Sequence, residues 1–217
     1  MKSKIFSIIY IISLSVFALT FSISLPIYCR FFYYAHINLL NLVDVTGYSR
    51  EQIIEAYNSV LNYLTLPFTE FSTGSLKFSL EGASHFKDVK SLFTLNTVAL
   101  IVSFIIVVVL TILNKTNKIT LYKFKNKSPF FYAFIINLAI PMLIGIVALI
   151  DFEFVFDVFH YIAFPGKSDW LFNPKLDEII NILPLEFFAS CAILIGVSLI
   201  IISIIYLIIA LKKPKNK

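Results

Sequence analysis

Four long apolar runs constrain the fold of this chain more than any other feature. They cover residues 5–25, 91–113, 130–150 and 187–211, and none of them contains Asp, Glu, Lys or Arg. About 20 apolar residues cross the ~30 Å hydrocarbon core of a bilayer, so each run is long enough to span a membrane as a helix. The chain is also 59% hydrophobic, compared with roughly 45–50% in soluble domains. We therefore predict an all-α polytopic membrane protein.

The distribution of charge predicts how the four helices are oriented. The segments before the first run, between the second and third, and after the fourth carry eleven basic residues and no acidic residue. The remaining polar segments carry seven basic residues and all thirteen acidic ones. Because basic residues concentrate in cytoplasmic segments, both termini are predicted to be cytoplasmic. The net charge of +5 then reflects membrane orientation and contact with lipid headgroups, and we expect no nucleic-acid partner.

The segments on the other side, residues 26–90 and 151–186, are expected to form a small extracellular cap on a single membrane domain. Ser49-Arg50-Glu51-Gln52 has the form of a capping box, and apolar residues follow at helical spacing. This pattern predicts an amphipathic helix over about residues 50–64. The alternation of Leu76, Phe78 and Leu80 permits a short strand, and residues 176–183 predict a second short amphipathic helix.

Aromatic residues follow the first apolar run directly and are typical of the membrane interface. Arg30 lies among them, where we expect it to anchor at lipid headgroups. The alternative role of Arg30 is contact with an anionic or carbonyl group of a lipid substrate. His36 is expected to be a surface or interfacial histidine.

Two other histidines give the strongest chemical indication in the sequence. His85 is followed three residues later by Asp88, and His160 is preceded three residues earlier by Asp157. On a helix each pair lies on one face. A carboxylate near an imidazole fixes its tautomer and raises its basicity, which suits a general base. Both histidines lie at the predicted extracellular face, so they are candidates for one site; the plain alternative is two interfacial histidines bonded to backbone.

Other kinds of site have weaker support. Two histidines and two aspartates are a conceivable metal set, but the sequence has neither a His-Glu-x-x-His motif nor a cysteine cluster. It also lacks a Gly-x-Ser-x-Gly elbow and a glycine-rich phosphate loop. We therefore expect no metal and no cofactor. A metal-dependent membrane hydrolase and a non-enzymatic four-span protein whose cap binds a partner remain as alternatives.

A series of motifs runs in order along nearly the whole chain. The motifs are Tyr48-Ser49-Arg50-Glu51, Asn62-Tyr63-Leu64, His85-Phe86-Lys87-Asp88-Val89-Lys90, Phe159-His160-Tyr161-Ile162-Ala163-Phe164-Pro165 with Trp170, and Leu183-Pro184-Leu185-Glu186-Phe187-Phe188. Together they resemble the lipoprotein intramolecular transacylase family. Ala163 departs from the pattern, which has an aromatic residue there, and Asp157 is not part of it.

The resemblance implies an acyltransferase of the bacterial cell membrane that acts on lipoproteins. Its substrate would be a lipoprotein with a diacylglyceryl group on its N-terminal cysteine. The acyl chain on the sn-2 oxygen would move to the cysteine α-amino group, giving the N-acyl, S-monoacylglyceryl (lyso) form. The resemblance implies that His85 and His160 are the two catalytic histidines.

Five residues are expected to bind the substrate or support the histidines: Asp88, Lys90, Arg30, Tyr161 and Trp170. Asp88 has two open roles, orienting His85 or pairing with a lysine. Lys90 has two as well, steadying an oxyanion or extending to the headgroups. The aromatic residues are expected to shape a pocket that excludes water. The expected partners are the lipoprotein and membrane lipid, and the sequence does not predict an oligomeric state.

Overall fold

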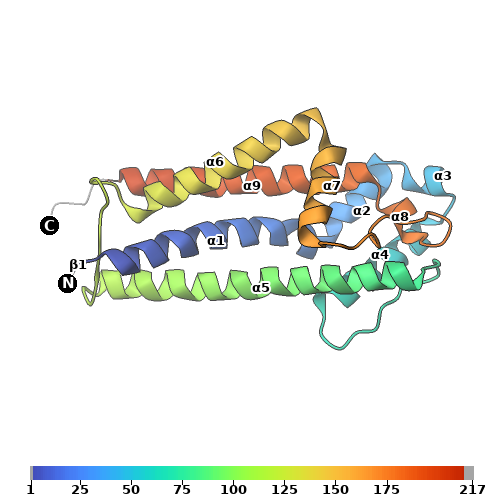
Figure 1. Ribbon diagram of the computed structural model, residues 1–217, viewed down its shortest axis with the longest axis horizontal. Helices are drawn as coiled ribbons and strands as arrows, with labels where there is room; N and C mark the ends of the chain where they lie inside the picture. The colour runs from blue at the N-terminus through green and yellow to red at the C-terminus, as the bar shows by residue number, and fades with distance from the viewer. Residues whose placement is uncertain (1, 213–217) are drawn as a thin grey trace. The chain divides into compact units, whose positions relative to one another are not determined.

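The structure is a computed structural model that describes residues 2–212, and its ribbon is almost entirely helical (Figure 1). Four helices are long and apolar enough to cross a membrane: α1 (Lys4–Tyr28), α5 (Leu80–Lys115), α6 (Pro129–Ile150) and α9 (Leu185–Leu211). The predicted all-α membrane fold with four spanning helices is therefore confirmed. The shorter elements are β1 (Lys2–Ser3), α2 (Arg30–Leu39), α3 (Leu42–Thr46), α4 (Arg50–Thr65), β2 (Thr120–Leu121), α7 (Phe152–Ala163) and α8 (Ile179–Ile182).

The chain divides into two compact units. The first, which we call the spanning unit, takes in the chain up to residue 24, residues 96–146 and the chain from residue 194. The second, which we call the histidine unit, takes in residues 25–95 and 147–193. It contains His36, His85 and His160.

In the spanning unit, polar side chains add hydrogen bonds to an apolar interior. The hydroxyl groups of Tyr10 and Thr111 lie 2.7 Å apart, and the Tyr206 hydroxyl donates to the Leu14 carbonyl at 3.1 Å. Such bonds matter between membrane helices, because lipid tails are as apolar as the side chains and give no hydrophobic drive to associate. The apolar core cluster of this unit consists of Tyr10, Leu14, Ala18, Leu110, Ala133, Leu199 and Tyr206.

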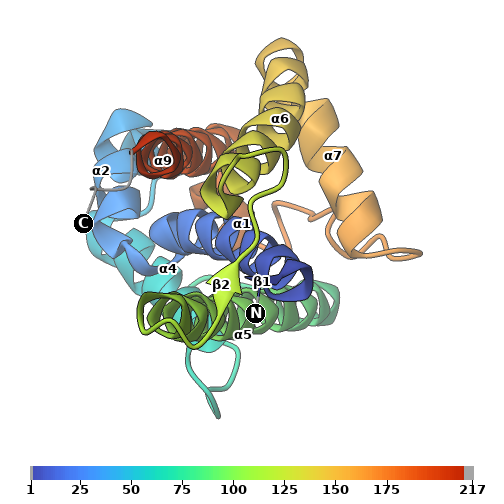
Figure 2. The same cartoon turned by 90° about the vertical axis from the view of Figure 1, so that its left-hand side faces the viewer.

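Two of the lysine-rich segments meet at one end of the spanning unit. Strand β1 pairs with β2 in parallel, with Lys2 opposite Thr120, and Figure 2 shows this pair in front of α1 and α5. The Lys4 ammonium lies 5.3 Å from the centre of the Tyr122 ring. The segment before α1 and the segment between α5 and α6 therefore share one side, as their charge predicts. Lys213, Lys215 and Lys217 lie outside the described residues.

The histidine unit is built on helix α4. Both bonds of the predicted capping box are present, since Gln52 N donates to Ser49 Oγ at 3.3 Å and Ser49 N donates to Gln52 Oε1 at 2.9 Å. The predicted helix over residues 50–64 is confirmed. Its Tyr57 ring stacks on Tyr33 of α2 with the ring centres 3.7 Å apart, and the Tyr33 hydroxyl donates to the Ile182 carbonyl. These contacts tie α2, α4 and α8 into one core.

Two local predictions in this unit are wrong. The segment at residues 76–80 is not a strand: Lys77 O accepts from Glu178 N at 3.0 Å, and Lys77 N donates to the Glu178 carboxylate at 2.9 Å. These two bonds satisfy the backbone groups that a neighbouring strand would need. His36 is buried rather than at the surface, and its Nδ1 donates to the Phe32 carbonyl at 2.7 Å. The short helix predicted over residues 176–183 is present only as α8.

The start of α5 is fixed by a buried carboxylate. Asp177 Oδ1 accepts from Ser79 N at 2.8 Å and from Ser79 Oγ at 2.9 Å, and Ser79 Oγ accepts from Gly82 N at 2.9 Å. A negative charge at this end also complements the helix dipole. The approach is so close that a Cβ on Gly82 would lie 2.2 Å from Asp177 Oδ1 and 3.2 Å from Phe172 Cε1. Glycine is the residue that fits there.

We expect Gly82→Ala to destabilise the protein by about 1–3 kcal/mol, because the added methyl group must push Asp177 away from the first turn of α5. Thermal unfolding in detergent micelles measures the change. Gly196→Ala is the matched control, since a Cβ on Gly196 meets no atom within 4 Å. Equal unfolding temperatures for the two variants would show that the contact with Asp177 does not constrain position 82.

Candidate active site

His85 lies in the second turn of α5, one helical turn after Gly82. Its side chain is buried, with 4% of the residue exposed. The Phe172 ring packs 5.4 Å from the His85 ring, centre to centre, and the same Phe172 lies against the Cβ position of Gly82. The contact that fixes the start of α5 therefore also fixes the surroundings of His85.

His160 lies near the end of α7. That helix begins at Asp151, whose carboxylate accepts from Phe154 N at 2.9 Å. The His160 side chain is buried, and its Nδ1 donates to the Phe156 carbonyl one turn earlier at 2.7 Å. Because this bond uses the proton on Nδ1, the neutral ring has Nε2 free to accept a proton.

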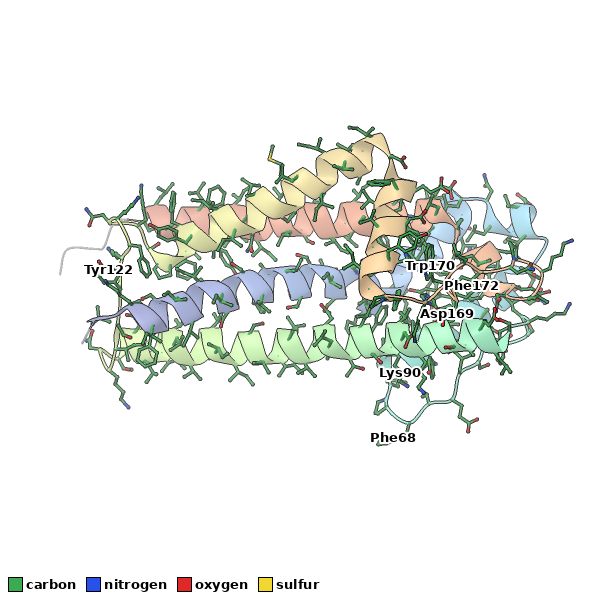
Figure 3. All side chains as sticks on the ribbon, in the orientation of Figure 1. Phe68, Lys90, Tyr122, Asp169, Trp170 and Phe172 are labelled. Atoms are coloured by element: carbon green, nitrogen blue, oxygen red, sulfur yellow. The ribbon has the colours of Figure 1, made fainter. Side chains whose placement is uncertain are left out.

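The two imidazole rings face one another inside an aromatic enclosure. Their centres are 5.8 Å apart. Phe164 lies 4.8 Å from His85 and 5.7 Å from His160, while Trp170 stacks on His160 at 4.8 Å. Figure 3 shows Trp170 and Phe172 close together, in the segment that follows α7. Two buried imidazoles surrounded by apolar rings form a site from which water is largely excluded.

A carboxylate that the sequence analysis missed faces His85. Asp169 Oδ1 lies 3.8 Å from His85 Nδ1, and among the described residues neither atom has a hydrogen-bond partner. Both atoms are buried. Asp169 is far from His85 in sequence and forms no helical pair with it, so spacing could not identify it. The only sequence signal was its neighbour Trp170.

The carboxylates predicted to orient the histidines lie elsewhere or act differently. Asp88 forms an ion pair with Lys167. Of the two roles considered for Asp88, the structure therefore shows the pairing with a lysine. The Nδ1 proton of His160 goes to the Phe156 carbonyl rather than to Asp157. The charge of Asp157 raises the pKa of His160 and so favours its protonated form.

The structure brings only one of the other supporting residues against a histidine. Trp170 stacks on His160, and the exposed Tyr161 packs edge-on against Trp170 at 5.3 Å. The Arg30 guanidinium donates to the side chains of Asn58 and Asn62 on α4, at 2.9 and 2.6 Å. It therefore fastens α2 to α4. The Lys90 ammonium lies 4.2 Å from the centre of the Tyr63 ring and 3.4 Å from Thr69 Oγ1.

The environment of His160 favours its neutral form. Burial lowers the pKa of His160 below the ordinary value of 6.5, opposed by the hydrogen bond to the Phe156 carbonyl and by the charge of Asp157. At neutral pH the ring is thus ready to accept a proton. Within residues 2–212 no group of three or more His, Cys, Asp and Glu side chains could hold a metal ion.

Comparisons with known protein families and with solved structures point to the same family. The family model of the lipoprotein intramolecular transacylase Lit matches residues 8–188. The solved structure of the membrane-integral lipoprotein intramolecular transacylase Lit from Bacillus cereus is similar with a TM-score of 0.85 and 25% sequence identity, over 94% of this chain and 92% of that one.

Two variants of the Bacillus cereus protein, with a histidine replaced by arginine or by alanine, share the fold. Each has a TM-score of 0.78 and 24% identity over 95% of this chain, and the matches cover 89% and 90% of the variant chains. No curated protein sequence matches.

We expect His160 to titrate below pH 6.5, because burial penalises its charged form. Proton–carbon NMR spectra of protein labelled at histidine Cε1 would follow all three rings against pH. His160→Gln identifies the His160 signal by its disappearance, and His36→Gln serves as the control for the assignment. A His160 midpoint at or above 6.5 would contradict the predicted effect of burial.

Proposed function

Because the chain belongs to the lipoprotein intramolecular transacylase family, we propose that it converts diacylglyceryl lipoproteins to their lyso form. The acyl chain leaves the sn-2 oxygen of the glyceryl group and joins the α-amino group of the N-terminal cysteine. The observation that carries the proposal is the pair of buried imidazoles, 5.8 Å apart, inside the aromatic enclosure.

The main requirement of the reaction is the positioning of the substrate's amine and ester groups. The amine and the ester belong to one molecule, so the enzyme needs no second substrate. It has to fold a flexible lipid so that the amine nitrogen meets the ester carbonyl carbon, and such positioning contributes roughly 7–11 kcal/mol in favourable cases. The aromatic walls formed by Phe164, Trp170 and Phe172 support this role, since they leave little room for water that would hydrolyse the ester.

The two histidines supply the proton transfers. As the amine nitrogen bonds to the carbonyl carbon, one imidazole takes a proton from that nitrogen. When the carbon–oxygen bond to the glyceryl group breaks, the histidine pair returns a proton to the departing oxygen. One amide forms, one ester is lost, and no net proton is consumed. The free Nε2 of His160 and the short distance between the rings suit this exchange.

The proposed enzyme has a defined location in the cell and a defined orientation in the membrane. The enzyme lies in the bacterial cell membrane with both termini in the cytoplasm, and His85 and His160 work at the extracellular face. The charge distribution supports this arrangement: the segments expected in the cytoplasm carry eleven basic residues and no acidic residue. Its partners are the lipoprotein substrate and the surrounding lipid.

We expect His85→Ala and His160→Ala each to lower acyl transfer by about 10²–10⁴-fold, because each removes a proton-transfer group. The measurement is fragmentation mass spectrometry of a reporter lipoprotein's N-terminal peptide. The host should lack other enzymes that N-acylate lipoproteins. The wild type should give one acyl chain on the cysteine nitrogen and one on the glyceryl group.

His36→Ala is the matched control. His36 is buried and bonded to a backbone carbonyl as His160 is, but it packs on Phe32 and Phe187 outside the enclosure. A well-expressed wild type that leaves the peptide diacylated would overturn the proposal and favour the metal-dependent or partner-binding alternatives.

A further inference from the structure

The contact between Asp169 and His85 brings together two buried polar atoms that have no hydrogen-bond partner among the described residues. Asp169 Oδ1 and His85 Nδ1 are both buried, both without a hydrogen bond among the described residues, and 3.8 Å apart. Buried polar groups are nearly always paired, so an unpaired one calls for an explanation. Catalytic hydrogen bonds are often long in structures without substrate and shorten when it binds. The two atoms are therefore placed to bond to each other.

The segment that carries Asp169 is held on both sides of it. Lys167 pairs with Asp88 on α5, one turn beyond His85. On the other side the Trp170 indole donates to the Lys167 carbonyl at 3.2 Å and stacks on His160. Asp169 thus has little freedom to turn away from the His85 ring. The ion pair at Asp88 thus holds the segment that presents Asp169 to His85.

We propose that Asp169 is a positioning residue for His85. Its carboxylate accepts the Nδ1 proton, which keeps the basic Nε2 free and stabilises the imidazolium that forms when His85 takes the amine proton. This inference rests on the proposed transacylase function. Asp169 Oδ1 would then gain its hydrogen bond fully when His85 becomes charged during the reaction.

The test combines acyl-transfer rates with histidine NMR. Asp169→Ala should lower the rate roughly tenfold to a hundredfold, as expected for loss of one hydrogen bond to a charged group. Nitrogen shifts of ¹⁵N-labelled histidine should also show His85 changing from the Nδ1-protonated tautomer to a mixture. Asp169→Asn keeps an oxygen acceptor without the charge, so it should preserve the tautomer and still slow the reaction. If Asp169 had only a structural role, Asp169→Asn would not slow the reaction while preserving the His85 tautomer.

Asp157→Ala is the matched control, since Asp157 is an aspartate beside the other histidine. It should leave the His85 tautomer and most of the rate unchanged. An active wild type, an inactive His85→Ala and a fully active Asp169→Ala with unchanged tautomer would overturn the role of Asp169 alone. An inactive wild type would instead overturn the proposed function, and the tautomer measurement would still decide whether Asp169 orients His85.

A second, independent observation concerns the loop after α4. Phe68 is fully exposed, with a relative accessibility of 102%, and Leu66 is 47% exposed. The adjacent Thr69 lies 3.4 Å from the Lys90 ammonium through its Oγ1. Figure 3 shows Phe68 at the tip of this loop, beside the part of α5 that carries Lys90. The loop thus presents an uncovered ring at the level of Lys90.

Lys90 marks the boundary between polar and apolar parts of α5. The helix has 36 residues and is therefore about 54 Å long, longer than the ~30 Å hydrocarbon core of a bilayer. Its uncharged run begins at residue 91, immediately after Lys90. We infer that Phe68 inserts into the lipid headgroup region and that Lys90 contacts anionic lipid beside it. Aromatic rings and lysine side chains both favour this interface.

Trp fluorescence in nanodiscs tests the insertion. Phe68→Trp is compared with Leu80→Trp, an equally apolar position that is 89% exposed at the first residue of α5, ten residues before Lys90. The parent, with Trp170 alone, is measured in parallel and its signal subtracted. Shallow brominated lipids should quench the added emission of F68W, and iodide should quench that of L80W. Strong iodide quenching of F68W without lipid quenching would overturn the insertion.

Discussion

The histidine unit depends on the buried contact between Asp177 and the first turn of α5. Asp177 bonds to the backbone and hydroxyl of Ser79, and the approach is close enough to require a glycine at position 82. Two segments far apart in sequence are joined there. Because Phe172 packs against both the Gly82 position and the His85 ring, the same contact also shapes the surroundings of the histidine. A structural glycine and a catalytic candidate thus occupy successive turns of one helix face.

The segment that contains Asp177 also forms much of the aromatic enclosure around the two imidazoles. The segment between α7 and α8, residues 164–178, begins shortly after His160 and contains Asp177 near its end. On the way it places Phe164, Asp169, Trp170 and Phe172 against the two rings. One tethered segment therefore provides much of the apolar wall together with Asp169, the carboxylate that faces His85. The ion pair between Lys167 and Asp88 fastens this segment to α5 near its start.

The sequence predicted features that depend on local pattern. The four spanning helices follow from the apolar runs, and α4 follows from its capping box. The juxtaposition of His85 and His160 was expected only from their shared side of the membrane. The position of Asp169 beside His85 could not be foreseen, because no periodicity links residues in a loop to residues in a helix. The strand predicted near residue 78 failed for the same reason: the partners of that backbone are Asp177 and Glu178, from a distant segment.

A site this simple is adequate because of the chemistry assigned to it. An acyl transfer within one molecule needs no cofactor to activate a donor and no pocket for a second substrate. The remaining demands are to hold amine and ester together, to move one proton from nitrogen to oxygen, and to exclude water. Two buried imidazoles can meet the second demand, and the aromatic walls meet the third. Under the proposed function the first demand also falls to these aromatic side chains, which surround the two imidazoles.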